Sequence, residues 1–122
     1  MMGFRELIKT VQIKSGFSDK ESKEALELMV ESLAVHLTEG ERKDFASQLP
    51  HELKDMALSV YATKQNSREG IIEQFMRTQG IEEDHAKKQI HSAWDALKEA
   101  LTRGQINHIR AQLPDSMVNF LH

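Results

Sequence analysis

The sequence predicts an all-α fold of about eight helices, arranged as two similar four-helix halves packed into one domain of residues 1–122. Apolar residues recur at helical spacings of three and four throughout the chain. The chain also matches itself without gaps when it is shifted by 64 residues. No segment shows the alternating, β-branched pattern of a strand. A length of 122 residues fits one conventional domain.

The first half covers residues 4–61 and opens with two amphipathic helices. Gly16 suits the left-handed turn that ends the first helix. Residues 18–21, Ser-Asp-Lys-Glu, form a capping box that opens the second helix. The apolar faces of these helices are Phe4, Leu7, Ile8 and Val11, and then Leu26, Met29, Val30, Leu33 and Leu37.

Two shorter helices complete this half. Residues 38–41, Thr-Glu-Gly-Glu, form a second capping box and begin the third helix. Pro50 suits the first turn of the fourth helix, where its missing N–H leaves no bond unmade. The apolar residues are Phe45 and Leu49 on the third helix, and Leu53, Met56, Ala57 and Val60 on the fourth.

The second half, residues 68–121, repeats this plan after a polar hinge at residues 63–67. Ten of the 52 residue pairs between positions 7–58 and 71–122 are identical, and most of them lie at turns or apolar positions. Each half has only about 60 residues, a marginal size for an independent core. We therefore expect the two halves to share one interior.

One motif recurs at this spacing: L-T-x-G, then Q-L-P before the last helix of each half. It consists of Leu37, Thr38, Gly40, Gln48, Leu49 and Pro50, and of Leu101, Thr102, Gly104, Gln112, Leu113 and Pro114. The doubled motif resembles a bacterial family of uncharacterised proteins, domain of unknown function 2267 (DUF2267), over residues 4–121. The resemblance implies an all-helical fold of two related halves, and it implies no activity, cofactor or catalytic residue.

Composition excludes several classes of protein. The net charge is −3 and neither half is basic, which argues against a nucleic-acid partner. The sequence has no cysteine, so it has no disulfide, thiol nucleophile or cysteine metal site, and this suits a cytoplasmic location. No apolar run reaches the roughly 18 residues of a membrane helix, and the N-terminus lacks the pattern of a signal peptide.

Catalytic and metal motifs are missing from the sequence. The six histidines are scattered, and neither H-E-x-x-H, G-x-S-x-G nor a phosphate-binding glycine loop occurs. We expect no catalytic residue, no metal and no cofactor. A metal site that joins His85 and His91 to a carboxylate is the alternative.

A few side chains are candidates for binding. Glu24, Glu27 and Glu31 lie on one face of the second helix, which is either a hydrated face or an acidic stripe for a basic partner. Trp94 and Phe75 are expected in the core, or beside a ligand cavity between the two halves. The glutamines of the two Q-L-P turns are expected to bond free backbone groups at a helix end, or to edge a groove.

These observations favour a non-catalytic module that acts through an unknown protein partner. A homodimer is one expected form, because Tyr61, Met117 and Phe120 lie near the ends of the halves and are expected to be exposed. The alternative is a carrier of a small apolar ligand in a cavity between the two halves.

Overall fold

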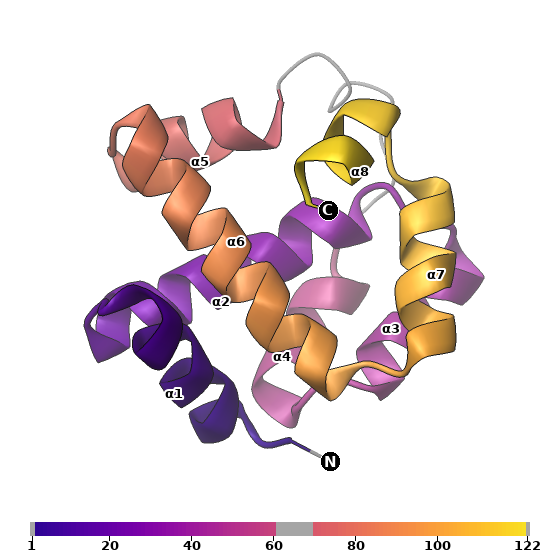
Figure 1. The fold of residues 1–122 in the computed structure, drawn as a ribbon. Coiled ribbons are helices and arrows are strands. Elements are labelled where there is room, and N and C mark those ends of the chain that lie inside the picture. Colours follow the sequence, from indigo (N-terminus) through magenta and orange to yellow (C-terminus); the bar gives the residue numbers. More distant parts are fainter. Residues whose placement is uncertain (1, 61–69, 122) are drawn as a thin grey trace.

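A computed structural model describes residues 2–60 and 70–121, and in these ranges it contains helices and no strand (Figure 1). The predicted all-α fold is confirmed. None of the described helices is long and apolar enough to cross a membrane. The predicted hinge at residues 63–67 lies outside the described residues, as does Tyr61. The eight helices are α1 Phe4–Ser15, α2 Asp19–Ala34, α3 Glu39–Ser47, α4 His51–Leu58, α5 Ile71–Gln79, α6 Glu83–Ala100, α7 Arg103–Gln112 and α8 Asp115–Phe120.

Helices α2 and α6 form the centre of the fold, and α6 runs diagonally across α2 (Figure 1). Helix α1 packs against both of them, α4 packs on α2, and α5 packs on α6. About half of the residues of each central helix are buried, nine of 16 on α2 and eight of 18 on α6. On α2 the buried residues are Ser22, Ala25, Leu26, Leu28, Met29, Val30, Ser32, Leu33 and Ala34. On α6 they are Ala86, Gln89, Ile90, Ser92, Ala93, Trp94, Ala96 and Leu97.

One cluster of buried apolar side chains takes members from all eight of these helices. Its largest members, Trp94, Phe45 and Phe75, come from α6, α3 and α5, and none of them has exposed surface. Burial of such side chains stabilises a fold by about 1.5–3 kcal/mol each. The two sequence halves therefore contribute to the same apolar cluster.

The helix boundaries recur at the spacing of the internal sequence match. Helices α2 and α6, α3 and α7, and α4 and α8 begin at positions that are 64 residues apart. Helices α1 and α5 both end at a left-handed glycine, Gly16 with φ 80° and Gly80 with φ 65°. Pro50 lies at the N-cap of α4, one residue before the first turn in which the sequence places it.

The two Q-L-P turns and the two L-T-x-G turns bond to each other across the molecule. The Gln48 Oε1 atom accepts a 2.9 Å hydrogen bond from the backbone N–H of Thr102, the N-cap of α7. In return, the Gln112 Oε1 atom accepts a 2.9 Å bond from the N–H of Thr38, the N-cap of α3. The prediction that these glutamines satisfy backbone groups at a helix end is confirmed, and the helix in each case belongs to the other half.

Each predicted capping box is confirmed only in part, because the bond to the hydroxyl group is present and the bond from the glutamate is not. Ser18 Oγ accepts from the N–H of Glu21 at 3.1 Å, and Thr38 Oγ1 accepts from the N–H of Glu41 at 3.3 Å. The two glutamate side chains do not return to the cap. Glu21 bonds to side chains of α6, and Glu41 Oε2 lies 3.8 Å from His108 Nδ1 on α7. For Glu21 the reason is that the cap lies beside α6, where Gln89 and His85 pair with its carboxylate.

Gly16, which has a positive φ, and Gly40, which lies within a helix, allow the effect of backbone conformation to be tested separately from that of packing. We expect Gly16→Ala to lower the free energy of unfolding by about 1–2 kcal/mol, because a left-handed backbone is costly for a residue with a Cβ. Gly40→Ala, in the first turn of α3, is expected to raise it by about 0.5–1 kcal/mol. An added Cβ meets no atom within 4 Å at either glycine. Urea denaturation measures both effects, and equal shifts in the same direction would contradict this account.

The reciprocal hydrogen bonds of Gln48 and Gln112 give a second prediction about stability. We expect Gln48→Ala and Gln112→Ala each to lower the free energy of unfolding by about 0.5–1.5 kcal/mol, the usual contribution of one hydrogen bond. Gln48→Glu keeps an oxygen acceptor for the Thr102 N–H, so it is expected to lose less than the alanine variant. Thermal or urea unfolding checks this. Alanine variants as stable as the wild type would show that these two hydrogen bonds do not contribute to the stability of the fold.

Candidate functional site

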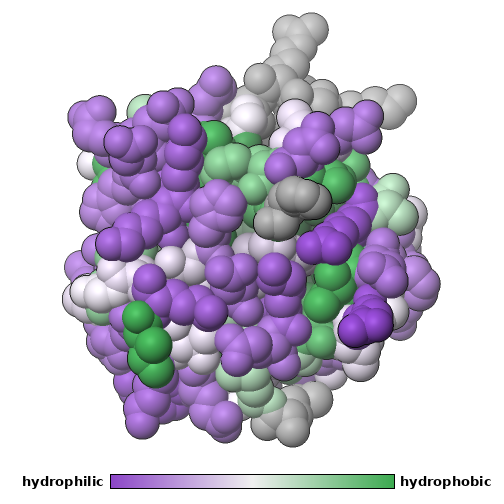
Figure 2. Space-filling view, in the orientation of Figure 1, coloured by the Kyte–Doolittle hydropathy of each residue, from purple (hydrophilic) through white to green (hydrophobic). Residues whose placement is uncertain are grey.

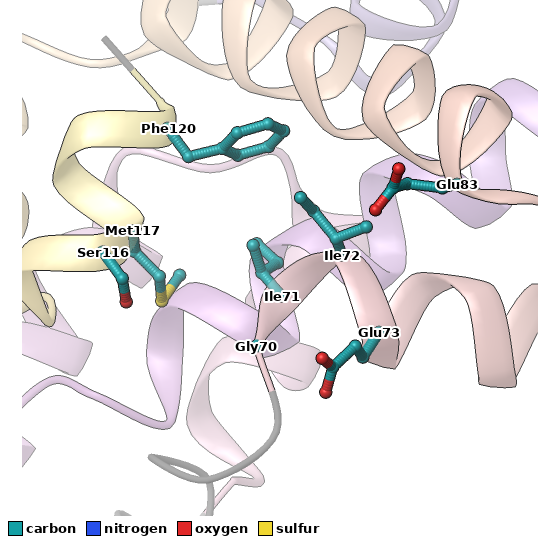
Figure 3. A pocket seen from close by; sticks show the side chains of 8 residues that line it. All are labelled: Gly70, Ile71, Ile72, Glu73, Glu83, Ser116, Met117 and Phe120. Atoms are coloured by element: carbon teal, nitrogen blue, oxygen red, sulfur yellow. The ribbon is translucent and has the colours of Figure 1, made fainter.

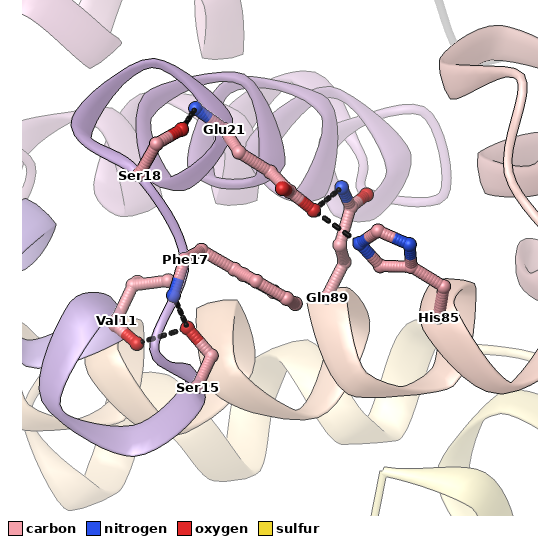
Figure 4. Close-up of polar contacts among 7 residues, drawn as sticks. All are labelled: Val11, Ser15, Phe17, Ser18, Glu21, His85 and Gln89. Atoms are coloured by element: carbon pink, nitrogen blue, oxygen red, sulfur yellow. Dashed lines mark hydrogen bonds and ion pairs between the residues drawn. The ribbon is translucent and has the colours of Figure 1, made fainter.

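A polar cluster joins α2 to α6 near the start of each helix (Figure 4). The Glu21 Oε2 atom accepts a 2.8 Å hydrogen bond from Gln89 Nε2 and is also paired with His85 Nε2. His85 stands on the Phe17 ring, with 5.2 Å between the ring centroids. Lys88 Nζ lies 5.5 Å from the centroid of the same phenyl ring. Phe17 is held in place because its N–H donates to Ser15 Oγ at 3.1 Å.

The position of this cluster follows from the internal match of the chain. Glu21 and His85 are 64 residues apart, so they occupy equivalent positions on α2 and α6. Two crossing helices that meet at equivalent positions bring these side chains face to face. Glutamate is negatively charged and a protonated imidazole is positively charged, so the two side chains form an ion pair when the imidazole is protonated.

The cluster lines an open depression of about 240 Å³ that also includes Glu24 and Lys20. A nucleophilic site needs a base that faces the attacking group. Here the Nε2 atom of His85 faces the Glu21 carboxylate, and Ser18 Oγ caps α2. The geometry therefore ties two helices together and does not form a nucleophile–base pair.

His91 lies apart from this cluster. His91 packs against the Phe120 ring at 4.6 Å between centroids, whereas His85 pairs with Glu21. Within residues 2–60 and 70–121, no group of three or more histidine, aspartate or glutamate side chains has an arrangement that could hold a metal ion. The alternative metal site at His85 and His91 has no third ligand among these residues.

The second candidate site is an apolar groove between α5 and α8, with a volume of about 190 Å³ (Figure 3). Figure 3 shows Met117 and Phe120 of α8 opposite Ile71 and Ile72 of α5. The other residues that line the groove are Gly70, Glu73, Glu83 and Ser116. Figure 2 shows apolar surface between these two helices, with hydrophilic side chains around it.

The groove exists because the second half is less tightly packed than the first. Helix α1 packs on both α6 and α4, whereas the equivalent contacts of α5 with α2 and α8 are marginal. Ile8 of α1 is only 3% exposed, and its counterpart Ile72 is half-buried. Helix α8 has only six residues, which limits the surface that it covers.

The structure places the sequence-predicted binding residues away from this groove. Trp94 and Phe75 are completely buried in the core, and neither ring lines the groove. Glu24, Glu27 and Glu31 are half-buried along α2, rather than fully on a solvent face.

Two residues of the groove, Met117 and Phe120 of α8, are among those that the sequence predicts to be exposed. The expectation that Met117 is exposed is wrong, because its side chain is only 5% exposed. Phe120 is half-buried. In the 64-residue register Ile71 and Ile72 correspond to Leu7 and Ile8, so the sequence predicts only that they lie on the apolar face of a helix. No residue pattern indicates that this face is incompletely covered.

His36, in the turn after α2, gives a pH-dependent prediction. Burial lowers the pKa of His36 below its ordinary value of 6.5. The unfolded chain therefore binds a proton more readily, so the free energy of unfolding should fall as the pH drops below the unfolded value. We expect His36→Gln to reduce this loss between about pH 8 and about pH 5. Unfolding curves of both proteins across this range check it, and parallel pH profiles would contradict it.

Comparison with known proteins gives a family and no activity. Neither a curated protein nor a solved structure matches the chain. The family model described as "Uncharacterized conserved protein (DUF2267)" matches residues 4–120. The match covers nearly the whole chain, so the protein belongs to the DUF2267 family.

Proposed function

We propose that the protein is a non-catalytic interaction module, and that the α5/α8 groove is the surface that contacts its protein partner. The observation that carries this proposal is the apolar floor of the groove, formed by Ile71, Ile72, Met117 and Phe120. Ile72 and Phe120 are only half-buried, and apolar side chains that meet solvent beside polar ones are typical of a protein contact site. A helix or loop that covers them would gain the hydrophobic free energy that the fold itself leaves unused.

The size of the groove favours a protein side chain over a stored ligand. Pockets for small molecules usually enclose about 300–1,000 Å³, whereas this groove measures about 190 Å³. All of its lining residues come from positions 70–120, within the second half of the chain. The apolar carrier with a cavity between the halves therefore has less support than the interaction module.

The edge of the groove favours a partner with basic residues. Glu73 and Glu83 stand beside the apolar floor (Figure 3). Glu83 also lies 3.8 Å from Lys87 Nζ, but such an exposed pair contributes little and leaves the carboxylate free to contact a partner. Opposite charge at the rim of an interface mainly raises the rate and specificity of binding.

The polar cluster supports the non-catalytic part of the proposal. Its glutamate is already engaged by His85 and Gln89, which connects α2 with α6. A sequence without cysteine is suited to a reducing compartment, so we assign the interaction to the cytoplasm.

Site-specific photocrosslinking tests the proposed surface in the cells that produce the protein. A photoreactive amino acid replaces Ser116, which is exposed and lines the groove. The matched control carries it at Ala111, an exposed residue of α7 outside the groove. We expect a discrete protein adduct from position 116 and none from position 111.

A groove variant makes the test specific. Ile72→Glu places a charge on the apolar floor, so it should remove the adduct from position 116 while the helical circular dichroism spectrum is retained. The proposal fails if positions 116 and 111 give the same products, or if Ile72→Glu leaves the adduct unchanged. A saturable apolar metabolite bound at the groove, with no protein adduct, would support the carrier instead.

A further inference from the structure

We propose that the α5/α8 groove receives the Ile13 side chain of a second copy of this chain, so that copies associate head to tail. This inference rests on the proposed function of the groove as a contact surface. Ile13 is 86% exposed, the highest value among the large apolar side chains of the described residues. A β-branched aliphatic side chain so fully in water gains more than any other on this surface from insertion into an apolar groove.

Ile13 stands on the outer face of α1, away from the core. The opposite face of the helix carries Leu7, Ile8 and Val11, which are buried. The arrangement therefore leaves a single aliphatic side chain that projects from a rigid helix. Because α1 packs on α6 and α2, its backbone is already ordered, and binding would cost little conformational entropy.

The groove matches this projection in size and chemistry. Its floor of two isoleucines, one methionine and one phenylalanine is aliphatic and adaptable, since methionine adjusts easily to a neighbour. A volume of about 190 Å³ suits a branched side chain with part of its helix turn better than it suits a drug-sized molecule.

The charges around the two surfaces are complementary. Lys9, one helical turn before Ile13, and Lys14 are both exposed on α1. Glu99 of α6 borders the same surface from the other side. The groove presents Glu73 and Glu83 at its edge. A docked α1 would bring its two ammonium groups to this acidic rim.

Leu58 is the other large exposed apolar side chain, and it serves as the natural control. It is 50% exposed at the end of α4, among Glu39, Arg42 and Lys43. Its basic neighbours are already engaged: Lys43 Nζ lies 3.5 Å from Glu39 Oε1, and the Arg42 guanidinium donates to the Leu37 carbonyl at 2.7 Å. Its surface therefore offers less apolar area and less free positive charge than that of Ile13.

The two surfaces belong to different regions of the molecule. Helix α1 lies at the lower left of Figure 1, and α8 lies at the upper right. A head-to-tail contact between unlike surfaces is heterologous, so an open chain keeps one free groove at one end and one free Ile13 at the other unless a ring closes. The predicted species are therefore rings or chains, and not only the symmetric dimer that exposed end residues suggest.

Sedimentation equilibrium of the purified full chain tests this inference. We expect the average mass of the wild type to rise with concentration. Ile13→Ser is expected to remain a monomer throughout, and Leu58→Ser is expected to associate like the wild type. Lys14→Glu should weaken association by about two- to fivefold, as for an exposed ion pair, and Glu73→Lys in the same chain should restore part of it.

A mixing experiment distinguishes head-to-tail contact from other modes. Ile13→Ser retains the groove, and Ile72→Glu retains the Ile13 side chain. Each variant alone should be monomeric, whereas their mixture should form a 1:1 heterodimer, because only one intact contact can then be made. Helical circular dichroism of each variant establishes that it is folded.

Three results would overturn the inference: a wild type that stays monomeric at all concentrations, an Ile13→Ser variant that associates normally, or a mixture that forms no heterodimer. The proposed function is separable from these results. If the photoreactive residue at position 116 captures a different protein while the purified chain stays monomeric, the interaction module stands and self-association fails.

Discussion

The fold depends on the crossing of α2 and α6, two helices in which about half of the residues are buried. Helices α1, α4 and α5 each pack on one or both of the central helices, and α3 packs in turn on α4 and α7. Small residues of both helices, such as Ala25 and Ala93, have no exposed surface. The hydrophobic free energy of this centre is shared by both sequence halves, so neither half has a separate set of apolar contacts.

Polar contacts then fix how the halves are oriented around that centre. Glu21 meets His85 and Gln89 at one place, and the two Q-L-P glutamines meet the opposite N-caps at another. The two glutamine bonds satisfy N–H groups that a helix start leaves without an intrahelical partner. Hydrogen bonds depend on direction as well as distance, whereas apolar packing tolerates small rotations. These polar contacts therefore fix the orientation of the two halves, which apolar burial alone would not specify.

The two halves differ in how completely their first helices are covered. Where α1 is covered by α6 and α4, its counterpart α5 leaves Ile72 half-buried beside the short helix α8. The groove thus forms where the second half follows the same order of helices as the first but covers its first helix less completely. At the same time Ile13 projects from α1, whereas its counterpart in the 64-residue register is Arg77. The two features that depart most from the common plan are the two that remain available for contact.

The sequence by itself determined the helical class, the order of the helices and most of their ends, because these depend on local spacing, on Gly16 and Gly80, and on the capping residues. It also indicated the role of Gln48 and Gln112 at helix ends. Only the tertiary structure decided which helix each glutamine caps, that Met117 is buried, and that Trp94 and Phe75 lie in the core and not at the groove. The physical reason is that periodicity assigns a residue to a face, whereas burial depends on which helix covers that face, a contact between residues far apart in the chain.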